Sequence, residues 1–368
     1  MSVPDVANRL KRPAAEIERW ESGDAAPTYA QLERLAYTLY KRPLAVFFLP
    51  SPPREADPQR EFRTLPDADL DTLSRDTHLH IRRAHAYQLA LKEVFAAGNP
   101  ATRRIWENMS LSRAAGILSQ AMQIRNILGI DMATQSDWSS DEAALKAWRA
   151  RIEDVGVFVF KNAFKQKEIS GFCLTDAQFP LIYLNNSTTK TRQTFSLLHE
   201  LAHLLLHVNG IGKLDLGYID QLTGKAQAIE RFCHAIAAAV LIPEQDFAQQ
   251  SAALPRRGED ITEEQYARLA ARYGVSREAV FRKLLDQGRV PRTLYDEKAR
   301  AWAGQQKAGN GGDWYASQNV YLSQRFAQAV ITQHYGQRLT IEQASELLGI
   351  KPKNFPGIEQ RILQGAGS

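Results

Sequence analysis

Residues 191–210, TRQTFSLLHELAHLLLHVNG, contain the pattern His-Glu-x-x-His. If this segment is helical, His199 and His203 lie one turn apart on the same face, because positions i and i+4 of a helix share a face. Two neutral imidazoles in that arrangement can bind one Zn²⁺ at about 2.0–2.1 Å. Glu200 stands beside them and can take a proton from a metal-bound water. The segment therefore predicts a zinc site in which Glu200 is the catalytic base.

The residues around this pattern are typical of a buried helix. Residues 187–189, Ser-Thr-Thr, offer N-cap side chains, and Asn209-Gly210 offers a C-terminal stop. The residues between are apolar nearly all round, which indicates a helix that packs on several sides. Ionisable groups at the centre of such a helix need a compensating partner, and a metal ion is one.

Composition sets the broad class of the protein. A chain of 368 residues is long enough for two or three domains with a substantial core. Its formal charge of +5 permits contact with nucleic acid without requiring it. It contains no apolar run of membrane-spanning length and no secretory leader, so we expect no membrane segment. Two cysteines are too few for a disulfide framework, and the expected location is the cytoplasm.

Residues 1–50 are expected to form a compact helical module. Residues 14–36, AAEIERWESGDAAPTYAQLERLA, resemble the Xre/Cro-type helix-turn-helix family. The resemblance implies that Ile17 and Trp20 pack inward and that the helix at residues 14–21 enters the major groove of DNA. DNA is therefore one candidate partner of this chain.

Two departures from that family keep an alternative open. The family has a further helix before the one that begins at Val3, so this helix lies upstream of Met1 or is missing from the module. Glu16 and Glu18 on the groove-facing helix repel phosphate, and Arg19 is the only base-facing residue that can hydrogen-bond. A helical protein-binding or dimerising module is the equal alternative.

A proline-rich linker is expected at residues 51–60, followed by a domain at residues 61–250 with a helical lead-in. Within it we expect a helix at residues 141–154, a strand at residues 155–161 and a hairpin of residues 169–174 and 181–185. This order predicts an α+β fold, a mostly helical chain with a small mixed sheet. Residues 181–185 are either an edge strand that pairs with an extended substrate or an ordinary core strand.

A catalytic zinc usually has three protein ligands and a water. His207 lies about 12 Å from His199 along the helix, too far to share one ion. Residues 225–241 are expected to form a second helix, small and apolar around an isolated carboxylate, Glu230. A buried carboxylate needs a cation, and zinc supplies one; the alternative is that Glu230 pairs with Arg231 or a distant arginine.

The segments HELAHLLLH at residue 199 and ERFCHAIAAAVLIP at residue 230 together resemble the ImmA/IrrE family of zinc metallopeptidases. The resemblance runs from about residue 60 to residue 290. It implies that Glu230 is the third zinc ligand, and it implies as substrate a transcriptional repressor, cut at one site to release stress, mobile-element or toxin–antitoxin genes. Where the family often has Asn or Asp, this chain has His234, which affects only the groups that orient the ligands.

The rest of the chain is expected to be helical. Residues 251–300 form a helix-turn-helix-like extension with a cap at Thr262 and a turn at Gly274. Its basic side chains suit phosphate contact, but packing against the protease domain is the interpretation that the family resemblance favours. A linker is expected at residues 301–313 and a last helical unit at residues 314–368.

The sequence thus predicts a zinc-dependent endopeptidase that cleaves a cytoplasmic regulatory protein, a repressor or an antitoxin. Zinc lowers the pKa of its water toward about 7, and Glu200 moves the proton to the departing amine. Tyr218 and His234 are candidates to stabilise the oxyanion. The alternative function is a helix-turn-helix DNA-binding regulator in which zinc is structural.

Overall fold

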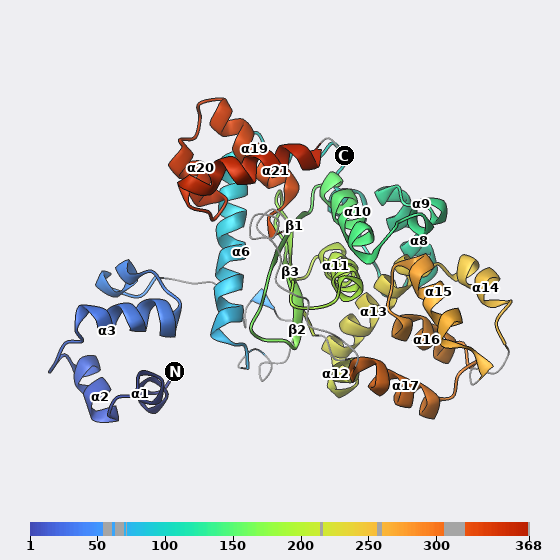
Figure 1. Ribbon diagram of the computed structural model, residues 1–368, viewed down its shortest axis with the longest axis horizontal. Coiled ribbons are helices and arrows are strands. Elements are labelled where there is room, and N and C mark those ends of the chain that lie inside the picture. The colour runs from blue at the N-terminus through green and yellow to red at the C-terminus, as the bar shows by residue number, and fades with distance from the viewer. Residues whose placement is uncertain are drawn as a thin grey trace.

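The computed structural model describes residues 1–53, 61–62, 70, 72–213, 216–255, 260–304 and 321–366. Most of this part of the chain is helical, with one small mixed sheet, in agreement with the expected α+β class (Figure 1). Residues 54–60 and 305–313 of the two expected linkers lie outside the described residues, as do residues 314–320 of the expected last unit. None of the described helices combines the length and apolar character that a membrane span requires.

The sheet has four strands in the order β1-β3-β2-β4. Strand β1 pairs with β3 in parallel, whereas β2 is antiparallel to both β3 and β4. The expected hairpin is present, and its two strands have the expected bounds. The strands are β1 (Phe158–Asn162), β2 (Ile169–Leu174), β3 (Leu181–Asn185) and β4 (Gly210–Lys213).

Successive residues of the sheet face two different cores, as the two-residue period of a strand requires. Ile182 and Leu184 pack in the core that contains helix α11 (Lys190–Leu205). Phe172 and Tyr183 pack in the core on the opposite face, which helix α6 (Arg75–Val94) covers. Figure 1 shows these two helices on either side of the sheet. Burial on both faces explains why these strands are continuously apolar.

Strand β3 lies inside the sheet, between β1 and β2. Its backbone groups are used on both sides, so the expectation that residues 181–185 form an edge strand for substrate is wrong, and the core-strand alternative is right. The outer strand near the end of α11 is β4, which the sequence analysis did not predict. The hydrogen bonds to β2 hold β4 in the sheet, although two of its four residues are glycines.

Helix α11 begins where expected, because the Thr189 side chain accepts a hydrogen bond from the Arg192 backbone. It ends at Leu205, earlier than the Asn209-Gly210 stop, since His207 adopts a left-handed φ of 57° and the chain turns into β4. Helices on its flanks complete this core: α7 (Ile105–Asn108), α8 (Ile117–Leu128), α9 (Met132–Ser136), α10 (Asp141–Asp154) and α13 (Gly224–Leu241). The short helix α12 (Leu216–Gln221) precedes α13, and its Tyr218 packs against the core on the other face of the sheet.

The region after α13 packs into the same core. Its helices are α14 (Glu244–Ser251), α15 (Glu263–Tyr273), α16 (Arg277–Asp286) and α17 (Arg292–Gly304). The expected cap at Thr262 and turn at Gly274 are present. Basic side chains here form ion pairs within the protein: Arg272 lies 2.7 Å from Asp246, Arg277 lies 3.1 Å from Glu263, and Lys283 lies 2.6 Å from Glu244. These contacts favour the packing role over phosphate contact.

The N-terminal helices form a small core of their own. Ile17 is buried in it and Trp20 packs against it, as expected. The elements are α1 (Val3–Leu10), α2 (Ala14–Ser22), α3 (Tyr29–Glu33), the π-helix η1 (Arg34–Tyr40) and the 3₁₀ helix η2 (Leu44–Phe48). The Arg82 side chain of α6 donates a hydrogen bond of 3.0 Å to the Lys41 carbonyl and so joins the two parts. A helix-turn-helix identity for this module stays a prediction.

The C-terminal helices pack on the same face of the sheet as α6 and share its core. Phe326 of α19 contacts Phe160 of β1 edge-on, with ring centres 5.7 Å apart. The elements are α19 (Gln324–Tyr335), α20 (Ile341–Leu347), the 3₁₀ helix η4 (Pro352–Asn354) and α21 (Phe355–Ala366). Figure 1 shows them beside one end of α6.

The interior position of β3 predicts a large loss of stability on Ile182→Ala. This side chain is fully buried against α11, so its truncation should lower the free energy of unfolding by about 2–5 kcal/mol. The matched control is Leu89→Ala on α6, because that leucine is 69% exposed. Urea denaturation of both variants measures the difference. Equal midpoints for the two would contradict the placement of β3.

Candidate metal centre

Three potential metal-ligating side chains meet where α11 and α13 pack together. Nε2 of His199 lies 3.1 Å from Oε2 of Glu230, and Nε2 of His203 lies 3.3 Å from Oε1 of Glu230. The two imidazole Nε2 atoms are 3.2 Å apart. Ligand atoms bound tetrahedrally at about 2.0–2.1 Å would be about 3.3 Å from one another. The cluster therefore has the spacing that one tetrahedral metal ion requires, and it contains the three residues that the sequence analysis expects as ligands.

These three side chains are almost removed from solvent. His203 is 0% exposed, Glu230 is 3% exposed and His199 is 6% exposed. Among the described residues no protein group hydrogen-bonds to Nδ1 of either histidine or to Oε1 of Glu230. Burial of polar groups without partners is costly. A metal ion bound by the two Nε2 atoms and the carboxylate would offset the part of that cost that falls on Glu230, and the donor set of two imidazoles and one carboxylate suits such an ion.

The charge state of Glu230 also suits a ligand. Burial acts to raise its pKa, but the nearby His203 and His199 outweigh this effect and hold the pKa below its usual value. Glu230 is therefore a carboxylate at neutral pH. This geometry disfavours the alternative in which Glu230 pairs with Arg231, because Arg231 forms its ion pair with Asp220, at 3.1 Å.

Glu200 lies beside the cluster but is not part of it. Its carboxyl group is completely buried, and within the described part of the chain neither oxygen has a hydrogen-bond partner. Burial raises the pKa of Glu200, while His203 and His199 act against that shift. A carboxylate with a raised pKa and unused oxygens is suited to accept and release a proton.

Two glycines of β4 give these side chains their space. A Cβ atom at Gly212 would lie 2.6 Å from Oε1 of Glu200 and 2.6 Å from Oγ of Ser170. A Cβ atom at Gly210 would lie 2.6 Å from the ring of His203. Side chains at either position would displace the site, so β4 must carry glycine there. Sequence reasoning missed this role; the Gly-x-Gly spacing directly after the helix was the available signal.

The other residues singled out in the sequence occupy different places. His207 is exposed at the end of α11 and does not join the cluster, as expected. Tyr218 and His234 both line a cavity that also reaches His199 and Glu230. Burial lowers the pKa of His234 to about 4, so this imidazole is neutral at physiological pH. The role of Tyr218 and His234 in stabilising the oxyanion stays a prediction.

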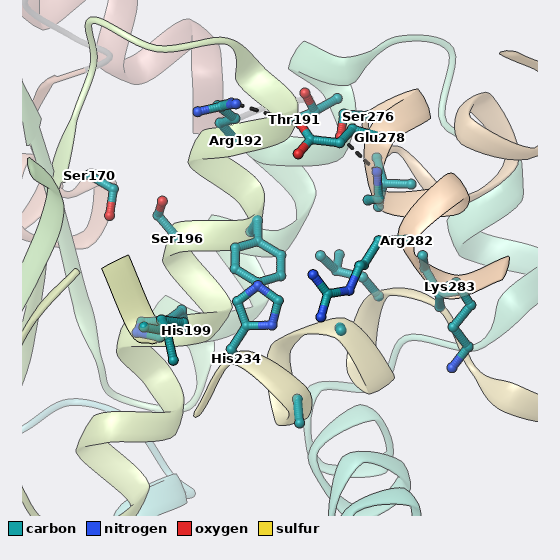
Figure 2. A pocket seen from close by; sticks show the side chains of 18 of the residues that line it. Ser170, Thr191, Arg192, Ser196, His199, His234, Ser276, Glu278, Arg282 and Lys283 are labelled. Atoms are coloured by element: carbon teal, nitrogen blue, oxygen red, sulfur yellow. Dashed lines mark hydrogen bonds and ion pairs between the residues drawn. The ribbon is translucent and has the colours of Figure 1, made fainter. Parts of the chain in front are cut away.

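The cavity has a volume of about 450 Å³ and extends from the cluster between α13 and α16 (Figure 2). An ion pair of 3.7 Å between Arg192 of α11 and Glu278 of α16 spans it. Residues that the sequence analysis did not assign to a site line it as well, among them Ser170, Phe195, Lys213, Ala238, Ala279 and Arg282. A buried cluster that could bind metal thus opens onto a space large enough for part of a peptide.

The segment that contains this site matches a known protein family. Residues 152–285 match the family model of the IrrE N-terminal-like domain, a peptidase family. The match covers a little over a third of the chain and includes the four described strands, the cluster of His199, His203 and Glu230, and α16 up to its next-to-last residue. No curated protein matches the chain. The family match supports a metallopeptidase in general and, with it, a protein substrate.

The cluster predicts one tightly bound divalent metal ion per chain. Replacing His199, His203 or Glu230 by alanine should remove it, because each substitution deletes one of three ligands. Glu200→Gln should retain it, since Glu200 is not part of the cluster. Elemental analysis of the purified variants measures this. Unchanged metal content in Glu230→Ala would contradict the ligand set.

The two β4 glycines predict separable defects. Gly210→Ala should reduce metal affinity, because the new methyl group meets the His203 ring. Gly212→Ala should leave the metal bound and lower activity, because its methyl group meets Glu200 while the nearest His199 atom is 3.7 Å away. Gly116→Ala is the control, since its methyl group meets only Oγ of Ser119 at 3.4 Å. Metal content and activity are measured together for each variant. If Gly210→Ala and Gly212→Ala showed the same losses, the separate roles of the two glycines would be contradicted.

Proposed function

We propose that this protein is a zinc-dependent endopeptidase. In this proposal His199, His203 and Glu230 bind Zn²⁺, and Glu200 is the catalytic base. The observation that carries the proposal is the meeting of the three ligand atoms at tetrahedral spacing beside a buried, unpaired carboxylate. Imidazole and carboxylate ligands in this number are those of catalytic zinc sites.

Zinc at this position would supply a Lewis acid that polarises the peptide carbonyl and activates water. Glu200 supplies the proton transfers: one carboxylate oxygen accepts a proton from the attacking water and then delivers it to the departing amine. The burial that raises the pKa of Glu200 makes it a stronger base for the first step. Gly212 leaves the space in which that carboxylate can face the substrate.

Strand β4 takes over the substrate-binding role that the sequence analysis gave to residues 181–185. It pairs with β2 on one side, and on its other side no described strand follows. A substrate in extended form could hydrogen-bond to that free side as an added strand. Gly210 and Gly212 touch the ligand His203 and the base Glu200, so this pairing would bring the scissile bond to the catalytic groups.

The proposed substrate is a cytoplasmic regulatory protein, either a transcriptional repressor or an antitoxin. The resemblance of the two motifs to the ImmA/IrrE family supports this choice. The described helices outside the matched segment, α1–α3 at one end and α19–α21 at the other, offer surfaces on which a folded partner could dock. Docking would explain how an enzyme with a common active site avoids general proteolysis.

A DNA-binding regulator with structural zinc is the alternative from another class. Structural zinc sites are closed by four protein ligands, whereas catalytic ones use three. The described residues bring three ligands together at this cluster, and a cavity opens beside it. Both features favour the enzyme.

The proposal predicts that Glu200→Gln retains zinc and loses peptidase activity by about 10²–10⁴-fold, because its proton carrier is gone. The control is Glu107→Gln, a half-exposed glutamate of α7 that pairs with Arg104 on the surface. Mass spectrometry of new termini in a mixture of denatured proteins measures cleavage. Chelation should abolish it and added Zn²⁺ restore it. Cleavage by Glu200→Gln at the rate of the control would overturn the mechanism.

A further inference from the structure

The metal ligand Glu230 stands at one end of a stripe of cavity-lining residues on α13. The stripe continues through His234, Ala238 and Leu241, which follow at intervals of four, four and three residues and so share one helix face. At about 1.5 Å per residue this face extends about 16 Å from the ligand. An extended peptide of about five residues has that length. The cavity is therefore a channel that leads away from the metal cluster.

The opposite wall of the channel is α16 with the turn before it. Val275, Ala279, Arg282 and Asp286 line it, again at the spacing of one helix face. Ala238 and Ala279 have small side chains on the two walls, and Phe195, Leu241 and Val275 add apolar surface around them. Small residues on both sides of an apolar channel leave room for one large apolar side chain.

Arg282 places a positive charge on this wall, one turn from the carboxylate of Asp286. Figure 2 shows its guanidinium group pointing into the cavity toward His234, whereas Lys283 points away. Asp286 accepts a hydrogen bond of 3.1 Å from Nε of Arg282, an atom at the inner end of the guanidinium group. The carboxylate of Glu278 faces Arg192 instead. Tyr295, which also lines the cavity, lies beside the guanidinium group, with its ring centre 5.7 Å from Cζ of Arg282. A carboxylate entering the channel would meet the terminal nitrogens of Arg282 next to this ring.

We propose that the channel between α13 and α16 is the specificity subsite for the substrate segment on one side of the scissile bond. It takes a large apolar side chain against Ala238 and Ala279, and it pairs an acidic side chain of the substrate with Arg282. This inference rests on the proposed peptidase function. The continuity of the channel with the metal ligand and the charge of Arg282 both indicate a peptide as the occupant. Helix α16 then recognises protein substrate, although its sequence resembles a DNA-contacting helix.

The first experiment maps cleavage preference. The zinc-loaded full-length protein is incubated with a library of ten-residue peptides, and mass spectrometry identifies the cleaved bonds, with Glu200→Gln as the blank. We expect a large apolar residue next to the cleaved bond and Asp or Glu within about three residues on the same side. Cleavage without either preference overturns the inference and leaves the peptidase proposal standing. Absence of any zinc-dependent cleavage overturns both.

Charge reversal separates recognition from packing. Arg282→Glu should change the preferred residue from acidic to basic, and Arg282→Gln should remove the preference. Arg268→Gln on α15 is the control, because Arg268 is exposed and does not line the channel. A merely structural role for Arg282 would lower activity toward all peptides equally, and this outcome would overturn the proposal. Zinc content and thermal unfolding show whether each variant is folded and loaded.

Filling the channel tests its apolar part. Ala238→Phe should raise KM for peptides with a large apolar residue by about tenfold or more, the loss expected when one such side chain is no longer buried. The rise in KM should be smaller for peptides with a small residue there. The same loss should appear without turnover, as weaker binding of a fluorescein-labelled preferred peptide to zinc-loaded Glu200→Gln,Ala238→Phe than to Glu200→Gln. Equal affinities would overturn the assignment of the channel.

Discussion

Two imidazoles and a carboxylate are buried together where α11 meets α13, and the rest of the site depends on how that burial is compensated. Each of these groups loses its hydration on folding, and their mutual contacts leave three polar atoms without a protein partner among the described residues. Such a cluster is expensive in an apolar core. One metal ion bound by the two Nε2 atoms and the carboxylate would compensate the buried charge of Glu230 and would link the chemistry of the site to the stability of the helix pair.

The sheet is adapted to the same cluster from the other side. Strand β4 runs close to α11, and a side chain at Gly210 or Gly212 would collide with His203 or Glu200. Glycine weakens a strand, yet here it permits the contact between the outer strand β4 and helix α11. Pairing with β2 supplies the hydrogen bonds that hold this short strand in place. The strand nearest to the metal cluster is therefore one that its own composition would not predict.

This difference shows which parts of the molecule could be predicted. The i, i+4 histidines, the caps at Thr189 and Thr262 and the bounds of β2 and β3 are local features, and local patterns identified them. The position of β3 inside the sheet is not local, because an apolar run of five residues fits an edge or a centre equally well. The roles of β4 and of the channel wall on α16 depend on contacts between segments far apart in the chain.

Helix α16 illustrates the same limit for function. A basic helix after a glycine turn is typical of DNA contact, but Arg277 and Lys283 are used in ion pairs to other helices. Arg282 differs, because its partner Asp286 lies one turn away on the same exposed helix face, and a half-exposed pair of this kind contributes little to stability. The ion pair of Arg282 and Asp286 therefore does not by itself require a positive charge on this wall of the channel. Recognition of an acidic group beside the metal cluster does require one, since a buried carboxylate of the substrate would otherwise lose its hydration without a partner.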